Sequence, residues 1–162
     1  MIRADQPKAT LDRTFRGSLD ELWDLWTTPE GIEAWWAPEG HRVAVRALDL
    51  RPGGEFTWET TAITPAQIEW QTKSGIPLTT VQRIVYTEVD PPRHLRYRNI
   101  IDFVPGVEPY EVDNEVDFEP TESGVRIVIR FSPLHSDEWT RLATLGYESQ
   151  LSHLDVALAS RR

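Results

Sequence analysis

With 162 residues, 40% of them hydrophobic and 27% charged, the chain has the length and composition of a globular domain that can bury a core and a cavity. A net charge of -9 argues against binding to nucleic-acid phosphates, and the lack of cysteine excludes disulfides, thiolate metal sites and a cysteine nucleophile. No apolar run reaches the roughly 20 residues that cross a bilayer, and the start MIRADQPKAT lacks the apolar core of a signal peptide. We therefore expect a single cytoplasmic domain over residues 1–162.

The first predicted element is a strand. Leu11, Arg13 and Phe15 alternate with polar neighbours, as in a half-buried strand that ends near Gly17. Arg13 would then point inward. It could pair with an acidic group of a ligand or with a buried carboxylate such as Asp49, or it could reach solvent at the end of the strand.

Two short helices are predicted next. Ser18 and Glu21 form a capping box that begins the first helix, which ends before Pro29. Pro29 suits the first position of the second helix, which is expected to run to about Trp36. The apolar face of the first helix has helical spacing and is formed by Leu19, Leu22, Trp23 and Trp26.

From residue 42 onward apolar residues recur at every second position. This alternation predicts strands, and the proline- and glycine-rich stretches between them predict turns. The strands are expected near residues 42–51, 54–62, 79–89, 94–103, 110–119 and 124–132. Residues 64–77 are either a short helix or an irregular excursion from a hairpin.

The strand near 110–119 has one apolar and one acidic face. Its acidic face is formed by Glu111, Asp113, Glu115, Asp117 and Glu119. The next strand turns Arg126 and Arg130 outward, beside that row. Such a row could bind a cation, but cross-strand ion pairs on a solvated face are the expected arrangement.

A long final helix is capped by Ser136 and continues to about Ala159. One apolar stripe on it consists of Tyr147, Leu151, Leu154 and Leu158. This stripe needs an apolar partner, and the inner face of a curved antiparallel sheet is available. We therefore predict an α+β fold in which the sheet wraps around the C-terminal helix, with two short helices after the first strand.

The order of these elements resembles the START-like (SRPBCC) superfamily, in particular the branch named for the activator of the large heat-shock ATPase. The matching motifs are LWDLWTTPEGIEAWWAP at 22–38, LDLRPGGEF at 48–56, EVDPPRHLRY at 88–97, and Gly146-Tyr147 before Leu151 and Leu154. The resemblance implies the helix-grip fold. It also implies hydrophobic ligand binding, polyketide cyclisation or stress-related roles, among which the fold does not choose.

The sequence departs from the family pattern in three places. Tyr147 stands where the family often has tryptophan, and residues 64–77 are longer than the usual hairpin loop, so they could remodel the mouth of a cavity. The eukaryotic co-chaperone that names the branch carries an additional N-terminal domain. Nothing in this sequence matches that domain, so we do not infer ATPase stimulation.

Aromatic side chains are the first candidates for a ligand site. Trp35, Trp36, Phe56 and Trp58 could line the mouth of the cavity, because large rigid rings bury much area per contact, or they could pack in the core. The helix residues expected to face the same space are Tyr147, Gln150, Leu151 and Leu154.

Polar residues that interrupt apolar inner faces are the second group of candidates. If the hairpin is centred on Gly106-Val107, Asn99 and Asn114 face each other across two strands. Together with the Tyr97 hydroxyl they would form a polar spot that can hold a carbonyl or a hydroxyl group. The alternative is that the two amides bond each other or buried water.

Catalytic and metal-binding signatures are scarce. The sequence has no Gly-rich phosphate loop, HExxH or GxSxG motif, and its histidines lack metal-ligand spacing, so we expect neither a metal nor a cofactor. His153 could border the cavity as an acid or base, or flank it on the surface.

We predict that the protein binds a small hydrophobic molecule between the sheet and the final helix, without nucleic-acid binding or membrane insertion. One alternative is a cyclase- or hydratase-like enzyme in which Tyr97, Asn99, Asn114 or Arg13 polarises a carbonyl. Another is a stress-linked surface interaction module of co-chaperone type. Exposed strand edges also allow a homodimer.

Overall fold

A computed structural model describes residues 8–102 and 104–161, and within these ranges the strands form one seven-stranded antiparallel sheet. The strand order is β1-β7-β6-β5-β4-β3-β2, so the first strand lies beside the last and the others follow as a meander. The strand bounds are β1 Ala9–Phe15, β2 His41–Leu48, β3 Glu55–Ala62, β4 Thr79–Asp90, β5 His94–Ile101, β6 Tyr110–Pro120 and β7 Val125–Phe131.

The helices are α1 Leu19–Thr27, α2 Pro29–Glu33, α3 Pro65–Ser74 and α4 Asp137–Ala159. Ser18 and Glu21 form the capping box predicted for α1, and the Ser136 hydroxyl accepts a hydrogen bond from the Trp139 amide at the start of α4. Within the described ranges, no helix combines the length and apolar character needed to span a membrane.

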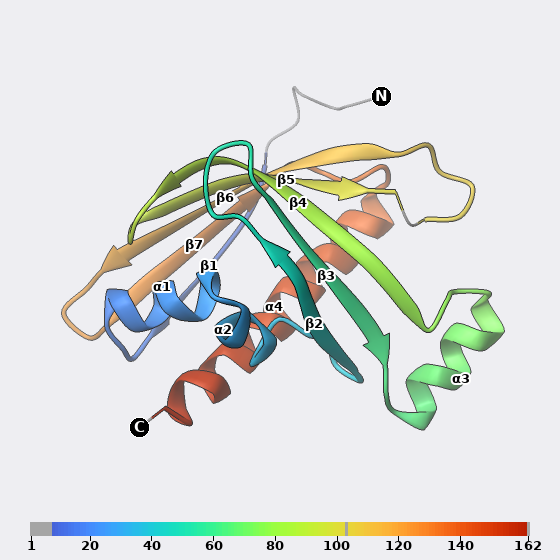
Figure 1. Ribbon diagram of the computed structural model, residues 1–162, viewed down its shortest axis with the longest axis horizontal. Helices are drawn as coiled ribbons and strands as arrows, with labels where there is room; N and C mark the ends of the chain where they lie inside the picture. The colour runs from blue at the N-terminus through green and yellow to red at the C-terminus, as the bar shows by residue number, and fades with distance from the viewer. Residues whose placement is uncertain (1–7, 103, 162) are drawn as a thin grey trace.

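The sheet arches over α4, which crosses one of its faces (Figure 1). Helices α1 and α2 lie near the C-terminal end of α4, and α3 projects beyond the ends of β3 and β4. The predicted α+β helix-grip fold, with two short helices after the first strand, is therefore confirmed.

Helix α4 is anchored unevenly. Its buried side chains are Leu151, Leu154, Ala157 and Leu158, and this half of the helix packs with α1 and β1. In the described structure no residue of α4 between 137 and 150 is buried. The N-terminal half is held by half-buried contacts, among them those of Ala143 and Tyr147 with the core, and this looser packing leaves a hollow beside it.

The outer face of the sheet carries the acidic row predicted for β6. Its carboxylates pair with arginines on neighbouring strands: Arg130–Asp117 (3.1 Å), Arg126–Glu119 (2.9 Å), Arg96–Asp113 (2.8 Å) and Arg98–Glu111 (3.3 Å). These are the cross-strand ion pairs expected from the sequence. Since they are partly or largely exposed, each contributes only about 0–1 kcal/mol.

Some boundaries differ from the predicted ones. The open question at 64–77 is resolved by α3, which Thr64 caps and which ends at Gly75 in the left-handed conformation (φ 73). Helix α2 ends at Glu33, and the chain then turns through Trp36. The strand predicted near 94–103 ends at Ile101, and residue 103 lies outside the described residues, as does the start of the chain up to residue 7.

Candidate functional site

A hollow of about 190 Å³ lies between the sheet and the N-terminal half of α4. We call it the inner pocket. Strands β3, β4 and β5 form one wall, α4 forms the opposite wall, and the segment between α2 and β2 closes one side. Its lining residues are Trp36, Pro38, Trp58, Thr60, Gln82, Ile84, Tyr97, Asn99, Ala143, Gly146, Tyr147 and Gln150.

The apolar wall of the inner pocket is aromatic. Trp36 and Trp58 line it, with their ring centroids 5.6 Å apart in an edge-to-face arrangement. Phe56 packs against both rings from outside the lining, at 5.7 Å from Trp36 and 4.5 Å from Trp58. Trp35 lies deeper, with its indole nitrogen donating to the Leu25 carbonyl oxygen at 2.7 Å. Of the four aromatic candidates, two therefore reach the pocket and two support them in the core.

The polar part of the wall comes from neighbouring strands. The Thr60 hydroxyl donates to the Gln82 amide oxygen at 2.7 Å, and Asn99 lies on the next strand. Among the described residues, the Asn99 side chain makes no hydrogen bond, and every residue that lines the pocket is uncharged. The pocket is thus suited to a neutral guest.

Two tyrosines at the pocket differ in their hydrogen bonding. The Tyr147 hydroxyl donates to the Asn114 amide oxygen, and the Asn114 amide nitrogen donates to the Val112 carbonyl oxygen at 2.9 Å. The Tyr97 hydroxyl is buried, yet within the described residues it makes no hydrogen bond of acceptable geometry. Among the described residues of this site, Tyr97 is therefore the fully buried polar side chain without a partner, whereas Asn99 is only half-buried.

Both phenols are neutral at pH 7, because the ordinary pKa of tyrosine is about 10 and burial raises it further. It raises the pKa of Tyr97 well above its ordinary value, and the nearby Tyr147 hydroxyl adds to that rise. Burial also raises the pKa of Tyr147 to about 12, although the nearby Tyr97 hydroxyl opposes part of this effect. At neutral pH each tyrosine therefore carries an O–H donor and not a phenolate.

Residues 36–40, which we call the strap, close one side of the pocket. The Gln150 amide nitrogen donates to the Trp36 carbonyl oxygen at 2.8 Å. One ring nitrogen of His153 lies 2.9 Å from the Ala37 carbonyl oxygen, and the other lies 3.2 Å from a carboxylate oxygen of Glu39. His153 does not line the pocket; it holds the strap on α4.

The predicted pairing of Asn99 with Asn114 is wrong. Asn114 lies opposite Tyr97, and Asn99 lies opposite Val112. The hairpin is centred between Pro105 and Gly106, one position earlier than assumed, and such a change shifts each partner by two residues. Asn99 therefore lines the pocket while Asn114 is buried behind Tyr147.

Three further candidates lie away from the pocket lining. Leu151 and Leu154 are buried in the core, beyond the end of the hollow. Arg13 lies 3.2 Å from the Ser152 hydroxyl and 3.6 Å from the Asp155 carboxylate, so it links β1 to α4. It does not pair with Asp49, whose carboxylate binds Arg51 at 2.8 Å in the turn before β3. That suggested pair is therefore wrong.

Sequence reasoning missed half of the lining. The missed residues are Pro38, Thr60, Gln82, Ile84, Ala143 and Gly146. Thr60 shares the inner face of β3 with Phe56 and Trp58, and Gln82 lies opposite Trp58. Both are polar residues on an apolar face, so the criterion that selected Asn99 would have found them if applied to these strands.

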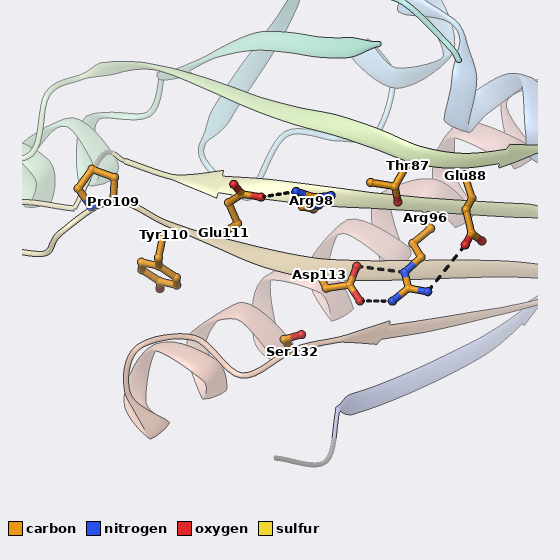
Figure 2. Close-up of a pocket in the computed structure, with 9 residues that line it drawn as sticks. All are labelled: Thr87, Glu88, Arg96, Arg98, Pro109, Tyr110, Glu111, Asp113 and Ser132. Carbon is orange, nitrogen blue, oxygen red and sulfur yellow. Dashed lines mark hydrogen bonds and ion pairs between the residues drawn. The ribbon is translucent and has the colours of Figure 1, made fainter. Parts of the chain in front are cut away.

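A larger hollow of about 760 Å³ lies on the outer face of the sheet (Figure 2). It is an open groove whose charged residues already bind one another: Arg96 lies between Asp113 and Glu88, and Arg98 reaches Glu111. Since these groups are mutually paired and solvated, the groove has no unmet charge to offer a ligand. The smaller inner pocket is the better candidate.

Within the described ranges, no group of three or more histidine, aspartate or glutamate side chains is arranged to hold a metal ion.

Comparison with known proteins agrees with this architecture. The family model described as Activator of Hsp90 ATPase homolog 1-like protein matches residues 16–159. No curated protein matches the sequence significantly.

Solved structures share the fold at low sequence identity. A crystal structure from Mycobacterium smegmatis has a TM-score of 0.76 at 20% identity, covering 100% of this chain and 97% of its own. A crystal structure from Chromobacterium violaceum has a TM-score of 0.75 at 19% identity, with coverages of 93% and 96%. The AHSA1-like protein from Aeromonas hydrophila has a TM-score of 0.73 at 17% identity, with coverages of 95% and 93%.

Proposed function

The chain belongs to the Activator of Hsp90 ATPase homolog 1-like family, and on that premise we propose that it binds a small hydrophobic molecule in the inner pocket. One observation carries this proposal: the sheet and the N-terminal half of α4 flank a half-open hollow, lined by Trp36 and Trp58, that no side chain fills. Aromatic walls with a few polar groups are typical of sites for small organic ligands.

The volume of the pocket indicates the size of the group that it can hold. An apolar cavity of about 150 Å³ in another protein binds benzene, whereas pockets for drug-sized ligands begin near 300 Å³, roughly. At about 190 Å³, the inner pocket suits a molecule with one ring and a short substituent.

Binding is favoured over the cyclase- or hydratase-like alternative by the chemistry of the lining. A general base needs a pKa near the working pH, but the titratable residues of the lining are Tyr97 and Tyr147, whose pKa values burial raises. The surface-interaction alternative stays a prediction. Retained partner binding in a variant with a filled pocket would support it.

Gly146 offers a direct test. A Cβ atom placed there meets nothing within 4 Å, so a larger side chain can enter the pocket from α4 without displacing backbone. We expect Gly146→Leu to fold and to lose binding of single-ring probes such as acetophenone, measured by calorimetry. Gly146→Ala is the matched control and should stabilise the helix by about 0.5–1 kcal/mol with a smaller effect on binding. Unchanged acetophenone binding by Gly146→Leu, or no saturable binding by the wild type, would refute the proposal.

A further inference from the structure

We propose that the ligand of the inner pocket is uncharged and carries a hydrogen-bond acceptor that the Tyr97 hydroxyl binds. This inference rests on the proposed function and specifies the chemical class of the guest. The acceptor would be a carbonyl or ether oxygen on a single-ring molecule, since a ring with a short substituent matches a hollow of about 190 Å³.

The first argument is the unmet hydroxyl. Buried polar groups in folded proteins are almost always hydrogen-bonded, and each exception calls for an explanation. Tyr97 lines the pocket, is 2% exposed, and has a hydroxyl without a partner among the described residues. A phenylalanine would fill the same space without this penalty. A ligand acceptor would supply what the protein does not.

The second argument is that the neighbouring hydroxyl is already used. Tyr147 donates its single proton to the Asn114 amide oxygen, so it has none left for a guest. The Tyr147 oxygen keeps acceptor capacity and lies close enough to Tyr97 to raise the pKa of that phenol, but the two hydroxyls are not aligned for a hydrogen bond. Tyr97 is therefore the tyrosine that can donate to a ligand, with Asn99 and Gln82 as additional amides on the same wall.

The third argument concerns charge. The lining contains no arginine, lysine or histidine, so an anionic guest would lose its hydration without gaining a cation. A cationic guest would find no carboxylate in the lining either. The pocket therefore selects neutral molecules.

Three probes with the same number of heavy atoms separate these properties. Acetophenone carries a carbonyl oxygen, α-methylstyrene replaces that oxygen with a methylene group, and benzoate replaces the ketone with a carboxylate. Binding of each is measured by calorimetry at pH 7 with the wild type, Tyr97→Phe and the control Tyr86→Phe. Tyr86 is also buried and packs edge-to-face with Tyr97 at 6.3 Å, but it does not line the pocket.

Acetophenone and α-methylstyrene differ in hydration, so the ratio of their dissociation constants is compared between variants; the difference in hydration is the same in each variant and cancels. We expect Tyr97→Phe to weaken the binding of acetophenone, relative to that of α-methylstyrene, by about 2- to 10-fold, which corresponds to the loss of one hydrogen bond. Tyr86→Phe should leave that ratio unchanged, and benzoate should bind more than about tenfold more weakly than acetophenone.

The outcomes distinguish the two proposals. A ratio that Tyr97→Phe leaves unchanged, or benzoate as the tightest probe, would overturn this inference while the pocket still binds small molecules. If neither neutral probe binds the wild type, or both bind Gly146→Leu as well as they bind the wild type, the proposed function fails and this inference fails with it.

Discussion

Tyr97 and Tyr147 are adjacent phenols, the first buried and the second half-buried, with opposite roles in stability. The Tyr147 hydroxyl satisfies the amide oxygen of Asn114, which is 1% exposed, whereas the Tyr97 hydroxyl satisfies nothing in the described structure. Removing a donor leaves a buried acceptor unpaired, but removing an unpaired hydroxyl removes only a penalty. The same chemical change should therefore have different effects at the two positions.

We expect Tyr147→Phe to lower the free energy of unfolding by about 1–3 kcal/mol, because Asn114 loses its donor. Tyr97→Phe should leave it unchanged or raise it by up to about 1 kcal/mol. Urea unfolding of the ligand-free protein measures both. A loss above about 1 kcal/mol for Tyr97→Phe would mean that its hydroxyl has a partner, and the case for a ligand acceptor would weaken.

The strap is the element that separates the inner pocket from solvent on one side. Its N-terminal part is held on α4 by Gln150 and His153, and its other end is held at the sheet, where the Gly40 carbonyl oxygen accepts a hydrogen bond from the Ile63 amide at 2.8 Å. Since Trp36 and Pro38 line the pocket, motion of this segment changes access to it.

His153→Ala removes two contacts of the strap without touching the pocket lining. We expect acetophenone to associate and dissociate about 2- to 10-fold faster, with a smaller change in affinity, because a loosened strap opens more often. Stopped-flow tryptophan fluorescence can follow this, since Trp36 and Trp58 lie in the wall. Glu148→Ala, an exposed change on the same helix, is the control and should leave both rates unchanged. Equal rates in His153→Ala and the wild type would place the entry route elsewhere.

Elements could be predicted from the sequence where local signals decide them. Capping residues, proline positions and a period of two fix the helices and strands, because each signal acts within a few residues. The register of β5 against β6 could not be predicted in this way. It depends on the path of the loop around Gly106, which has a left-handed φ of 78. The predicted centre of the hairpin was wrong by one position, so Asn114 was expected in the pocket wall but lies behind it.

At the scale of the whole molecule, the inner pocket results from where α4 is held. The stripe from Tyr147 to Leu158 predicts which face of the helix meets the sheet. It does not predict that burial stops at Leu151, because that depends on the curvature of a sheet assembled from distant strands. For this reason the sequence pointed to Tyr147 and Gln150 as pocket residues, and equally to Leu151 and Leu154, which lie in the core.

The outer face of the sheet gives the molecule a pH-dependent stability. His94 lies between Asp117 and Glu88, and each carboxylate is 2.8 Å from one of its ring nitrogens. Burial by itself lowers the pKa of His94, but the hydrogen bonds and charges of the two carboxylates outweigh burial, so the pKa is raised above its ordinary value. The same two carboxylates also pair with arginines: Glu88 with Arg96, on the strand of His94, and Asp117 with Arg130 on β7.

A raised folded-state pKa means that the histidine stabilises the fold fully below about pH 6.5, its unfolded value, and less as pH rises through the folded value. We therefore expect the free energy of unfolding to fall by up to about 1 kcal/mol from pH 6 to pH 8.5, and this fall to disappear in His94→Gln. Glu88→Gln should reduce the slope because one attracting charge is gone. Glu111→Gln is the control: it changes the net charge by the same amount, but Glu111 pairs with Arg98 and not with His94, so this variant should keep the wild-type slope. Urea unfolding across this range gives all four slopes, and a fall that persists in His94→Gln would assign the pH dependence to another group.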